Sequence, residues 1–235
     1  MENNQILDIH THSNAGHVGA IVNYKLFAAS SGCDDSVSDL GNEGSQLLPG
    51  ICYSVGIHPC DLSEWNAKKQ LDELQGLLEK SPFAAIGEAG LDKLASASMQ
   101  LQIDVFEAQV RLSERYCLPL IIHCVKAMDE LLAVRKRCNP FQPWIWHSFR
   151  GKPEQAKQLL DKGFYLSFRE LYPAETMRLV PDERLFLETD DTGLAIEAVL
   201  RKAAEVREVS TNALSRVISA NVQAVFLRGK SCFFR

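Results

Sequence analysis

Histidine and carboxylate side chains in this sequence recur at the ends of short apolar runs. Six of them have the chemistry of metal ligands: His10, His12, Glu88, His123, His147 and Asp190. His10 and His12 are two residues apart, so on a strand both imidazoles point to the same face and can bind one cation. Four imidazoles and two carboxylates exceed the ligands of one tetrahedral zinc site. They suit two divalent cations bridged by a carboxylate and a water.

The apolar runs that end in these residues have the length of β-strands. We predict eight strands, over residues 6–12, 19–24, 51–58, 83–88, 120–123, 144–147, 164–168 and 184–190. They do not alternate strictly between apolar and polar residues, which is typical of parallel strands covered on both faces. Apolar residues at helical spacing predict helices over residues 63–80, 100–116, 127–138, 153–162, 195–206 and 211–227.

Several of these helices carry end signals. Ser63 is the expected N-cap of the first helix, and Ser210 or Thr211 that of the last. Pro153 is suited to the first turn of the fourth helix, and Gly163 is suited to end it.

The alternation of strands and helices predicts an α/β fold. Eight strands in 235 residues favour one domain over residues 1–235, a shortened (β/α)8 TIM barrel. Only residues 13–18 separate the first two strands, so we expect a loop in place of the first helix. Residues 30–48 are rich in Gly, Ser, Asp and Asn and are expected to form a long loop. Active sites of such barrels lie at the carboxyl ends of the strands, where the candidate ligands fall.

The composition is that of an ordinary globular protein, with 46% hydrophobic and 23% charged residues. It excludes an intrinsically disordered, collagen-like or low-complexity chain. The net charge of −5 gives no overall basic field that would attract nucleic acid or an anionic membrane. A phosphate-bearing substrate must therefore be held by local groups.

The same sequence carries few signs of targeting or of protein partners. It contains no apolar run of membrane-spanning length and no recognisable secretory signal. Its seven cysteines include no C-x-x-C pair, which favours reduced thiols over disulfides or a structural zinc site. We therefore expect a cytoplasmic protein without a membrane interaction and with no evident obligate protein partner.

Six segments around the candidate ligands resemble the motifs of one family. They are D-I-H-T-H (8–12), S-V-G-I-H-P (54–59), A-I-G-E-A-G-L-D (85–92), P-L-I-I-H (119–123), H-S-F-R-G (147–151) and L-E-T-D (187–190). Their order and spacing are similar to those of the TatD family of metal-dependent hydrolases, within the amidohydrolase-like barrel superfamily. Phe106 and Gln109, together with Asn221, match helix positions of the same family.

The resemblance implies a role for each ligand. His10, His12 and Asp190 would hold one divalent cation, and His123 and His147 would hold the second. The cations, Zn²⁺, Mn²⁺ or Mg²⁺, would activate a water and polarise a phosphoryl or acyl oxygen.

Two carboxylates would also be catalytic by the same resemblance. Glu88 would bridge both cations, and Asp190 would also orient the water as a general base. Asp92 would orient a ligand or its own loop.

The resemblance further implies a phosphodiesterase with deoxyribonuclease activity, acting on DNA or on a small phosphodiester. His58 matches a family position near the substrate, and its alternative role is to shape the loop that begins at Pro59. Five cations follow strand ends and are candidates for a rim that binds phosphates: Lys93, Lys126, Arg150, Lys152 and Arg169. Of these, Lys126 and Arg150 are the expected substrate contacts.

The chain departs from the family pattern in two places. Cys124-Val125-Lys126 stands where the family usually has an Arg-Asp pair after the histidine. Asp191-Thr192-Gly193 stands where the family usually has Ser-Pro and a long loop. These departures leave two alternatives open: a metal-dependent hydrolase of a small amide, ester or lactone, and a degenerate barrel without catalysis.

Overall fold

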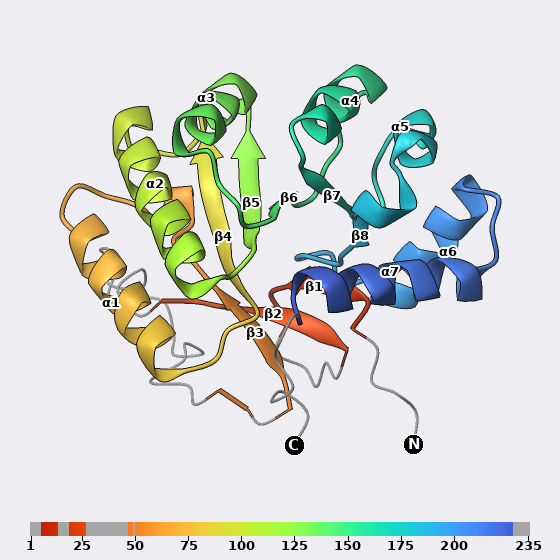
Figure 1. Cartoon of the computed structure of the whole chain (residues 1–235), viewed down its shortest axis with the longest axis horizontal. Helices are drawn as coiled ribbons and strands as arrows, with labels where there is room; N and C mark the ends of the chain where they lie inside the picture. The colour runs from red at the N-terminus through yellow and green to blue at the C-terminus, as the bar shows by residue number, and fades with distance from the viewer. Residues whose placement is uncertain (1–5, 14–18, 27–46, 49, 228–235) are drawn as a thin grey trace.

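Eight parallel strands form a closed barrel in which the strands follow one another in chain order (Figure 1). The computed structural model describes residues 6–13, 19–26, 47–48 and 50–227. The strands are β1 (Asp8–Thr11), β2 (Ala20–Tyr24), β3 (Cys52–Val55), β4 (Ala85–Asp92), β5 (Leu120–Val125), β6 (Trp144–Trp146), β7 (Tyr165–Phe168) and β8 (Leu185–Leu187). Pairing of β1 with β8 closes the ring. The predicted (β/α)8 TIM barrel is confirmed.

Helices surround the strands on the outside of the barrel (Figure 1). They are α1 (Ala67–Lys80), α2 (Met99–Tyr116), α3 (Met128–Cys138), α4 (Pro153–Asp161), α5 (Ala174–Leu179), α6 (Ile196–Val206) and α7 (Thr211–Val225), with short 3-10 turns η2 (Pro59–Asp61) and η3 (Asp182–Arg184). Three predicted helix ends are confirmed. Pro153 is the first residue of α4, Gly163 follows this helix with a φ of +80°, and the Ser210 hydroxyl accepts from the backbone N–H of Ala213. In the described part of the chain, no helix has the length and apolar character needed to cross a membrane.

The predicted start of α1 at Ser63 is wrong. The helix begins at Ala67, because side-chain hydrogen bonds hold the preceding residues in a turn. The Asn66 side chain accepts from the backbone N–H of Ser63 at 2.8 Å and donates to the carbonyl of Asp61 at 2.8 Å. An Asn side chain that bonds locally in this way competes with helical hydrogen bonding.

Helix α5 was not predicted from the sequence. It has six residues between Pro173 and Pro181, too few to show a repeated apolar pattern. Contacts with distant residues stabilise it instead. Met177 is fully buried, and the Thr176 hydroxyl donates to the carbonyl of Gly151 at 2.9 Å.

Strands β4 and β5 are longer than predicted, and they approach each other closely at the barrel mouth. Their pairing continues to Asp92 and Val125. Gly90 permits this approach, since a Cβ atom there would overlap the carbonyl oxygen of His123. Glu88 and His123 are thereby placed on neighbouring strands at the same end of the barrel. The loops predicted over residues 13–18 and 30–48 fall almost entirely outside the described residues.

Candidate metal centre

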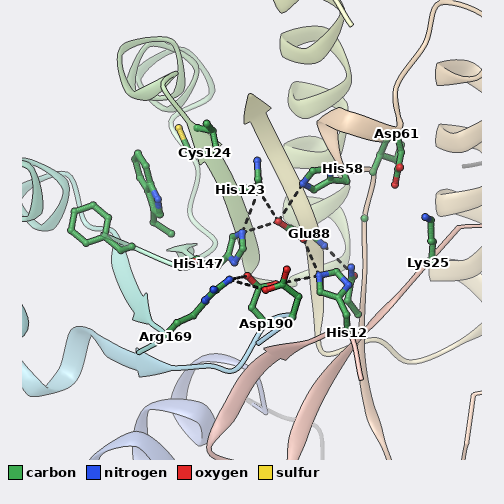
Figure 2. Close-up of a pocket in the computed structure, with 18 of the residues that line it drawn as sticks. His12, Lys25, His58, Asp61, Glu88, His123, Cys124, His147, Arg169 and Asp190 are labelled. Carbon is green, nitrogen blue, oxygen red and sulfur yellow. Dashed lines mark hydrogen bonds and ion pairs between the residues drawn. The ribbon is translucent and has the colours of Figure 1, made fainter. Parts of the chain in front are cut away.

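All six predicted ligands converge at the carboxyl ends of the strands. Figure 2 shows His12, Glu88, His123, His147 and Asp190 pointing toward one another. His10 lies on β1 and is fully buried, and His147 follows β6 and is nearly so. Their ring centroids are 4.8 Å apart although 136 residues of chain separate them. Closure of the barrel therefore brings side chains from the ends of β1 and β6 together across its mouth.

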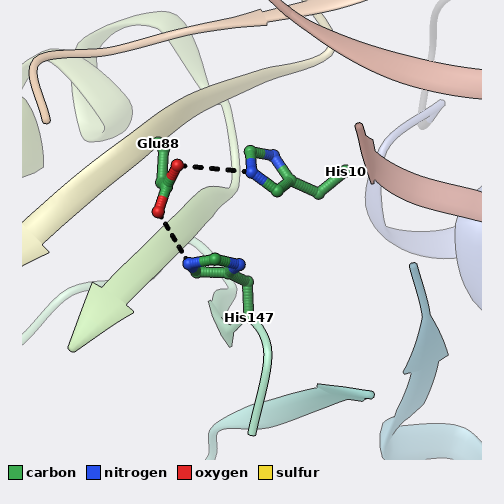
Figure 3. Close-up of side chains that lie close together, drawn as sticks. All are labelled: His10, Glu88 and His147. Carbon is green, nitrogen blue, oxygen red and sulfur yellow. Dashed lines mark ion pairs between the residues drawn. The ribbon is translucent and has the colours of Figure 1, made fainter. Parts of the chain in front are cut away.

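The two oxygens of Glu88 face different histidines, and His58 also lies 3.4 Å from Oε1. Oε2 lies 3.3 Å from Nε2 of His10 and 3.4 Å from Nε2 of His12. Oε1 lies 2.8 Å from Nδ1 of His123 and 2.7 Å from Nε2 of His147. Figure 3 shows His10 and His147 on opposite oxygens of the carboxylate. This is the arrangement that a carboxylate shared by two cations requires.

Asp190 completes the first group of ligands. Its Oδ1 lies 3.4 Å from Nε2 of His12 and 3.7 Å from Nε2 of His10. Its Oδ2 accepts a hydrogen bond of 2.7 Å from Nη1 of Arg169. Its backbone N–H donates to the carbonyl of His10, which ties the end of β8 to β1. The carboxylate is thus fixed from both sides.

Left-handed backbone conformations gather at this mouth. Lys126, Ser148 and Asp190 have φ values of 54°, 49° and 53°, and all three line the same pocket. Non-glycine residues in this region are strained, and such strain persists where the surrounding structure imposes it, often at functional sites.

The burial of His10 is a further observation, beyond the residue types, that fits a bound metal ion. His10 has no exposed surface, and among the described residues neither of its ring nitrogens has a hydrogen-bond partner of acceptable geometry. An unpaired buried polar atom is costly and rare in native proteins. A cation bound at Nε2 would satisfy this atom, because Nε2 faces the carboxylates of Glu88 and Asp190.

Two further carboxylates hold the histidines by their remaining ring nitrogens. Nε2 of His123 lies 3.1 Å from Oδ2 of Asp92, and Nδ1 of His147 lies 3.1 Å from Oε1 of Glu188. Glu188 is fully buried and also accepts from the backbone N–H of Ser148 at 2.7 Å. Asp92 was anticipated as an orienting group and Glu188 was missed. Its signal was its place in L-E-T-D, two residues before Asp190 on the same strand end.

We expect Glu188→Gln to weaken the binding of one Mn²⁺ ion about 10- to 100-fold, the usual cost of losing a carboxylate that orients a ligand. Calorimetric titration of metal-free protein measures this affinity. Glu130→Gln is the control, because Glu130 lies on α3 and is paired with Lys93 rather than with a candidate ligand. Equal Mn²⁺ affinity in wild type and Glu188→Gln would remove Glu188 from this role.

The carboxylates and imidazoles of the cluster shift one another's pKa values toward the charged forms. Burial works to raise the pKa of Glu88, but the imidazoles of His147, His10 and His12 hold it well below its usual range. Hydrogen bonding to Asp190 and then to Glu88 raises the pKa of His12 to about 9. Burial opposes a charge on His147, yet Glu88 and Glu188 raise its pKa well above the ordinary value. At neutral pH, without bound cations, His12 and His147 therefore carry an additional proton.

These protons must leave when cations bind, so Mn²⁺ binding should release protons and strengthen with pH. The affinity is expected to rise about tenfold per pH unit for each displaced proton. The rise should extend from pH 6 to about 9, where His12 loses its proton unaided. Titration calorimetry in two buffers of different ionisation enthalpy counts the protons. An affinity that is equal at pH 6 and pH 8, with no proton released, would contradict this charge state.

The cluster forms the floor of an open pocket of about 960 Å³. Of the five predicted rim cations, the pocket brings together Lys126, Arg150 and Arg169 but not Lys93 or Lys152. The pocket also includes a cation that sequence reasoning missed. Lys25 directly follows β2, and the rule that identified the other rim cations would have found it.

His58 lies beside the second group of ligands. Its Nε2 is 3.4 Å from Oε1 of Glu88, and its ring centroid is 4.3 Å from that of His123. Its Nδ1 accepts from the backbone N–H of Cys60 at 3.1 Å, which caps η2. A neutral imidazole that accepts at Nδ1 carries its proton on Nε2. His58 therefore shapes the loop that begins at Pro59 and directs Nε2 toward Glu88, and its place near the substrate stays a prediction.

Side chains from α2 hold the strand ends that carry these groups. Gln109 accepts from the backbone N–H of Ile57 at 2.7 Å and donates to its carbonyl at 3.2 Å. Gln102 makes the same pair of bonds with the backbone of Asp92, at 2.7 and 2.9 Å. His58 and Asp92 are therefore anchored from outside the barrel.

Comparisons with known proteins identify a family for this chain. A family model described as TatD related DNase matches residues 7–227. A protein of Erwinia billingiae named 3′-5′ ssDNA/RNA exonuclease TatD is 35% identical over 153 residues, which cover 60% of this chain and 58% of that protein. A protein of the same name from a Pantoea species is 33% identical over 159 residues, again covering 60% and 58%. The matched region thus spans less than two thirds of these curated relatives.

Solved structures share the fold. A TatD family hydrolase from Entamoeba histolytica has a TM-score of 0.72 at 18% identity and covers 96% of this chain and 99% of its own. A TatD homologue from Escherichia coli K12 has a TM-score of 0.67 at 24% identity, covering 75% and 77%. The family model spans the barrel from β1 to the end of α7 and includes every candidate ligand. This chain therefore belongs to the TatD related DNase family.

Proposed function

We propose that this protein is a metal-dependent hydrolase that cleaves phosphodiester bonds in single-stranded nucleic acid. One observation carries the proposal: the two oxygens of the buried Glu88 carboxylate face different histidines, His10 and His12 on one side and His123, His147 and His58 on the other. Two cations held by one shared carboxylate are typical of enzymes that hydrolyse phosphate esters. The curated relatives named as exonucleases support the same reaction.

The candidate ligands would form two groups, one for each cation. One cation would be held by His10, His12 and Asp190, the other by His123 and His147, and both by Glu88. When bound, two divalent cations such as Zn²⁺, Mn²⁺ or Mg²⁺ lower the pKa of water and withdraw charge from the phosphoryl oxygen.

Three side chains would act on the substrate and the water. Asp190 would orient the attacking water and accept its proton, while Arg169 holds the other carboxylate oxygen. His58 would donate its Nε2–H to a phosphate oxygen, because its other nitrogen is engaged by Cys60.

Substrate phosphates beyond the reacting one would be bound by Lys126 and Arg150. They follow the adjacent strands β5 and β6, both are exposed, and both line the pocket. Neither makes an ion pair with a described residue, so their charges are available to an anion. Only eight residues, 188–195, connect β8 to α6, which leaves this side of the mouth with little cover. We propose a preference for chain ends over internal duplex sites.

Lys126→Ala and Arg150→Ala should each raise KM for an oligonucleotide about two- to fivefold, the range of an exposed ion pair. KM for a small phosphodiester should change little, since that substrate does not reach the rim. Each lost phosphate contact should also reduce the slope of log K against log salt by about 0.7 on single strands. Lys157→Ala, an exposed lysine of α4 that does not line the pocket, is the control. Equal effects on both substrates would exclude a rim that binds distant phosphates.

The reaction itself is tested with metal-loaded protein and end-labelled single-stranded DNA. Wild type should release label, and Asp190→Asn should not, which controls for contaminating nuclease. Equal release by both proteins, with wild type alone cleaving an ester or amide, would overturn the nuclease proposal in favour of acyl hydrolysis.

We also propose that residues 1–235 form one barrel domain that needs no protein partner. Among the described cysteines, Cys60, Cys117, Cys124 and Cys138 are free thiols. Free thiols suit the reducing environment of the cytoplasm, which is where we place the protein.

A further inference from the structure

We propose that Arg169 binds a phosphate of the substrate. We further propose that Asp191 pairs with Arg169 when no substrate is bound and thereby sets the affinity of the site for an anionic substrate. This inference rests on the proposed function, and it concerns side chains that lie beside the metal ligands rather than among them. Arg169 follows β7 and lines the pocket next to Asp190 (Figure 2).

One nitrogen of the Arg169 guanidinium is shared by two consecutive carboxylates. Nη1 donates to Oδ2 of Asp190 at 2.7 Å and to Oδ1 of Asp191 at 2.9 Å. Nη2 makes no hydrogen bond with a described residue, and it is not enclosed by the protein. The guanidinium therefore retains a donor that no described residue uses. A planar fork with a free donor is well suited to a phosphate oxygen.

The two carboxylates are held very differently. The Asp190 side chain is 12% exposed and is fixed by the histidines of the cluster. The Asp191 side chain is 73% exposed and has no other hydrogen-bond or ion-pair partner among the described residues. Water can solvate Asp191 when its contact breaks, so the cost of displacing it is small. An incoming phosphate would take the place of Asp191 and leave Asp190 where it is.

Arg169 is expected to keep its position when a phosphate replaces Asp191. Its side chain is only 13% exposed, and its Nε lies 3.6 Å from Oε2 of Glu170. Three carboxylates thus surround one guanidinium, and its charge is more than neutralised before substrate arrives. Removing the exposed carboxylate should make the same guanidinium a stronger phosphate ligand. Asp191 would accordingly set how tightly this mouth holds an anionic substrate.

A double-mutant cycle on binding tests this coupling. The probe is a fluorescent single-stranded oligonucleotide with phosphorothioate linkages that resist cleavage, titrated into Mn²⁺-loaded protein. Asp191→Asn should tighten Kd about two- to fivefold. Arg169→Ala should weaken it at least about tenfold and reduce the salt slope by about 0.7. The double variant should bind like Arg169→Ala alone, because Asp191 would act only through Arg169.

The matched control is Asp61→Asn, which removes the same charge from the same pocket without touching Arg169. Its effect should be smaller than that of Asp191→Asn and should persist in the Arg169→Ala background. Metal content is measured for every variant. If Arg169→Ala loses metal or stability, Arg169→Gln replaces it, since an amide can still donate to Asp190 without the charge.

The outcomes separate this inference from the proposed function. If the wild type does not bind the oligonucleotide, the proposed function fails and this inference fails with it. If the wild type binds and Asp191→Asn tightens binding equally with and without Arg169, or no more than Asp61→Asn does, only the inference is overturned.

Discussion

Glu88→Gln is expected to lower kcat by at least about 10³-fold, the effect of losing several kcal/mol of transition-state stabilisation by metal. The substitution keeps the size and shape of the side chain but removes the charge that both histidine pairs face. An amide also presents only one oxygen, so it cannot serve both groups of ligands at once. We therefore expect the bound metal to fall from two ions per chain to one or none, measured by elemental analysis beside kcat.

Loss of folding must be separated from loss of the cluster. Glu107→Gln is the matched control, because Glu107 is a mostly buried acid paired with Arg137 on the outside of the barrel. Thermal unfolding of the metal-free proteins should show that both variants remain folded. Two bound ions and full activity in Glu88→Gln would exclude the bridging role.

Removal of metal by a chelator should abolish activity, and added Mn²⁺ or Zn²⁺ should restore it. The reason is that the cations would lower the pKa of the attacking water and withdraw charge from the phosphoryl oxygen, which the lysine and arginine side chains of the pocket cannot do. The metal-free protein should remain folded, since the buried core of the barrel does not depend on the cluster. It should nevertheless be less stable, because a ligand present at 100 times its Kd stabilises a protein by about 2.7 kcal/mol.

The measurement pairs activity with metal content and with the unfolding temperature. Chelator that has been saturated with Mn²⁺ beforehand is the control for direct effects of the chelator. Activity that persists in protein with less than about one tenth of an ion per chain would show that the reaction does not need the cluster, against the two-metal scheme.

Much of this site could be predicted from the sequence because its signals are local. Each ligand stands at the end of a short apolar run, and a parallel barrel brings all such ends to one face. His10 and His12 share a face because strand side chains alternate. The capping of α7 by Ser210 and the end of α4 at Gly163 depend on neighbouring backbone alone, and both were predicted.

The tertiary structure alone decided which atoms meet. The division of the Glu88 oxygens between His10 and His12 on one side and His123 and His147 on the other depends on how β1, β5 and β6 orient their ends around β4. The contact of Arg169 with Asp190 and Asp191 spans more than 20 residues, and that of Glu188 with His147 spans 41. Helix α5 likewise depends on Gly151 and the core rather than on its own pattern. Hydrogen bonds between distant residues leave no periodic or local signal in a sequence, because they arise only when the closed barrel fixes both partners.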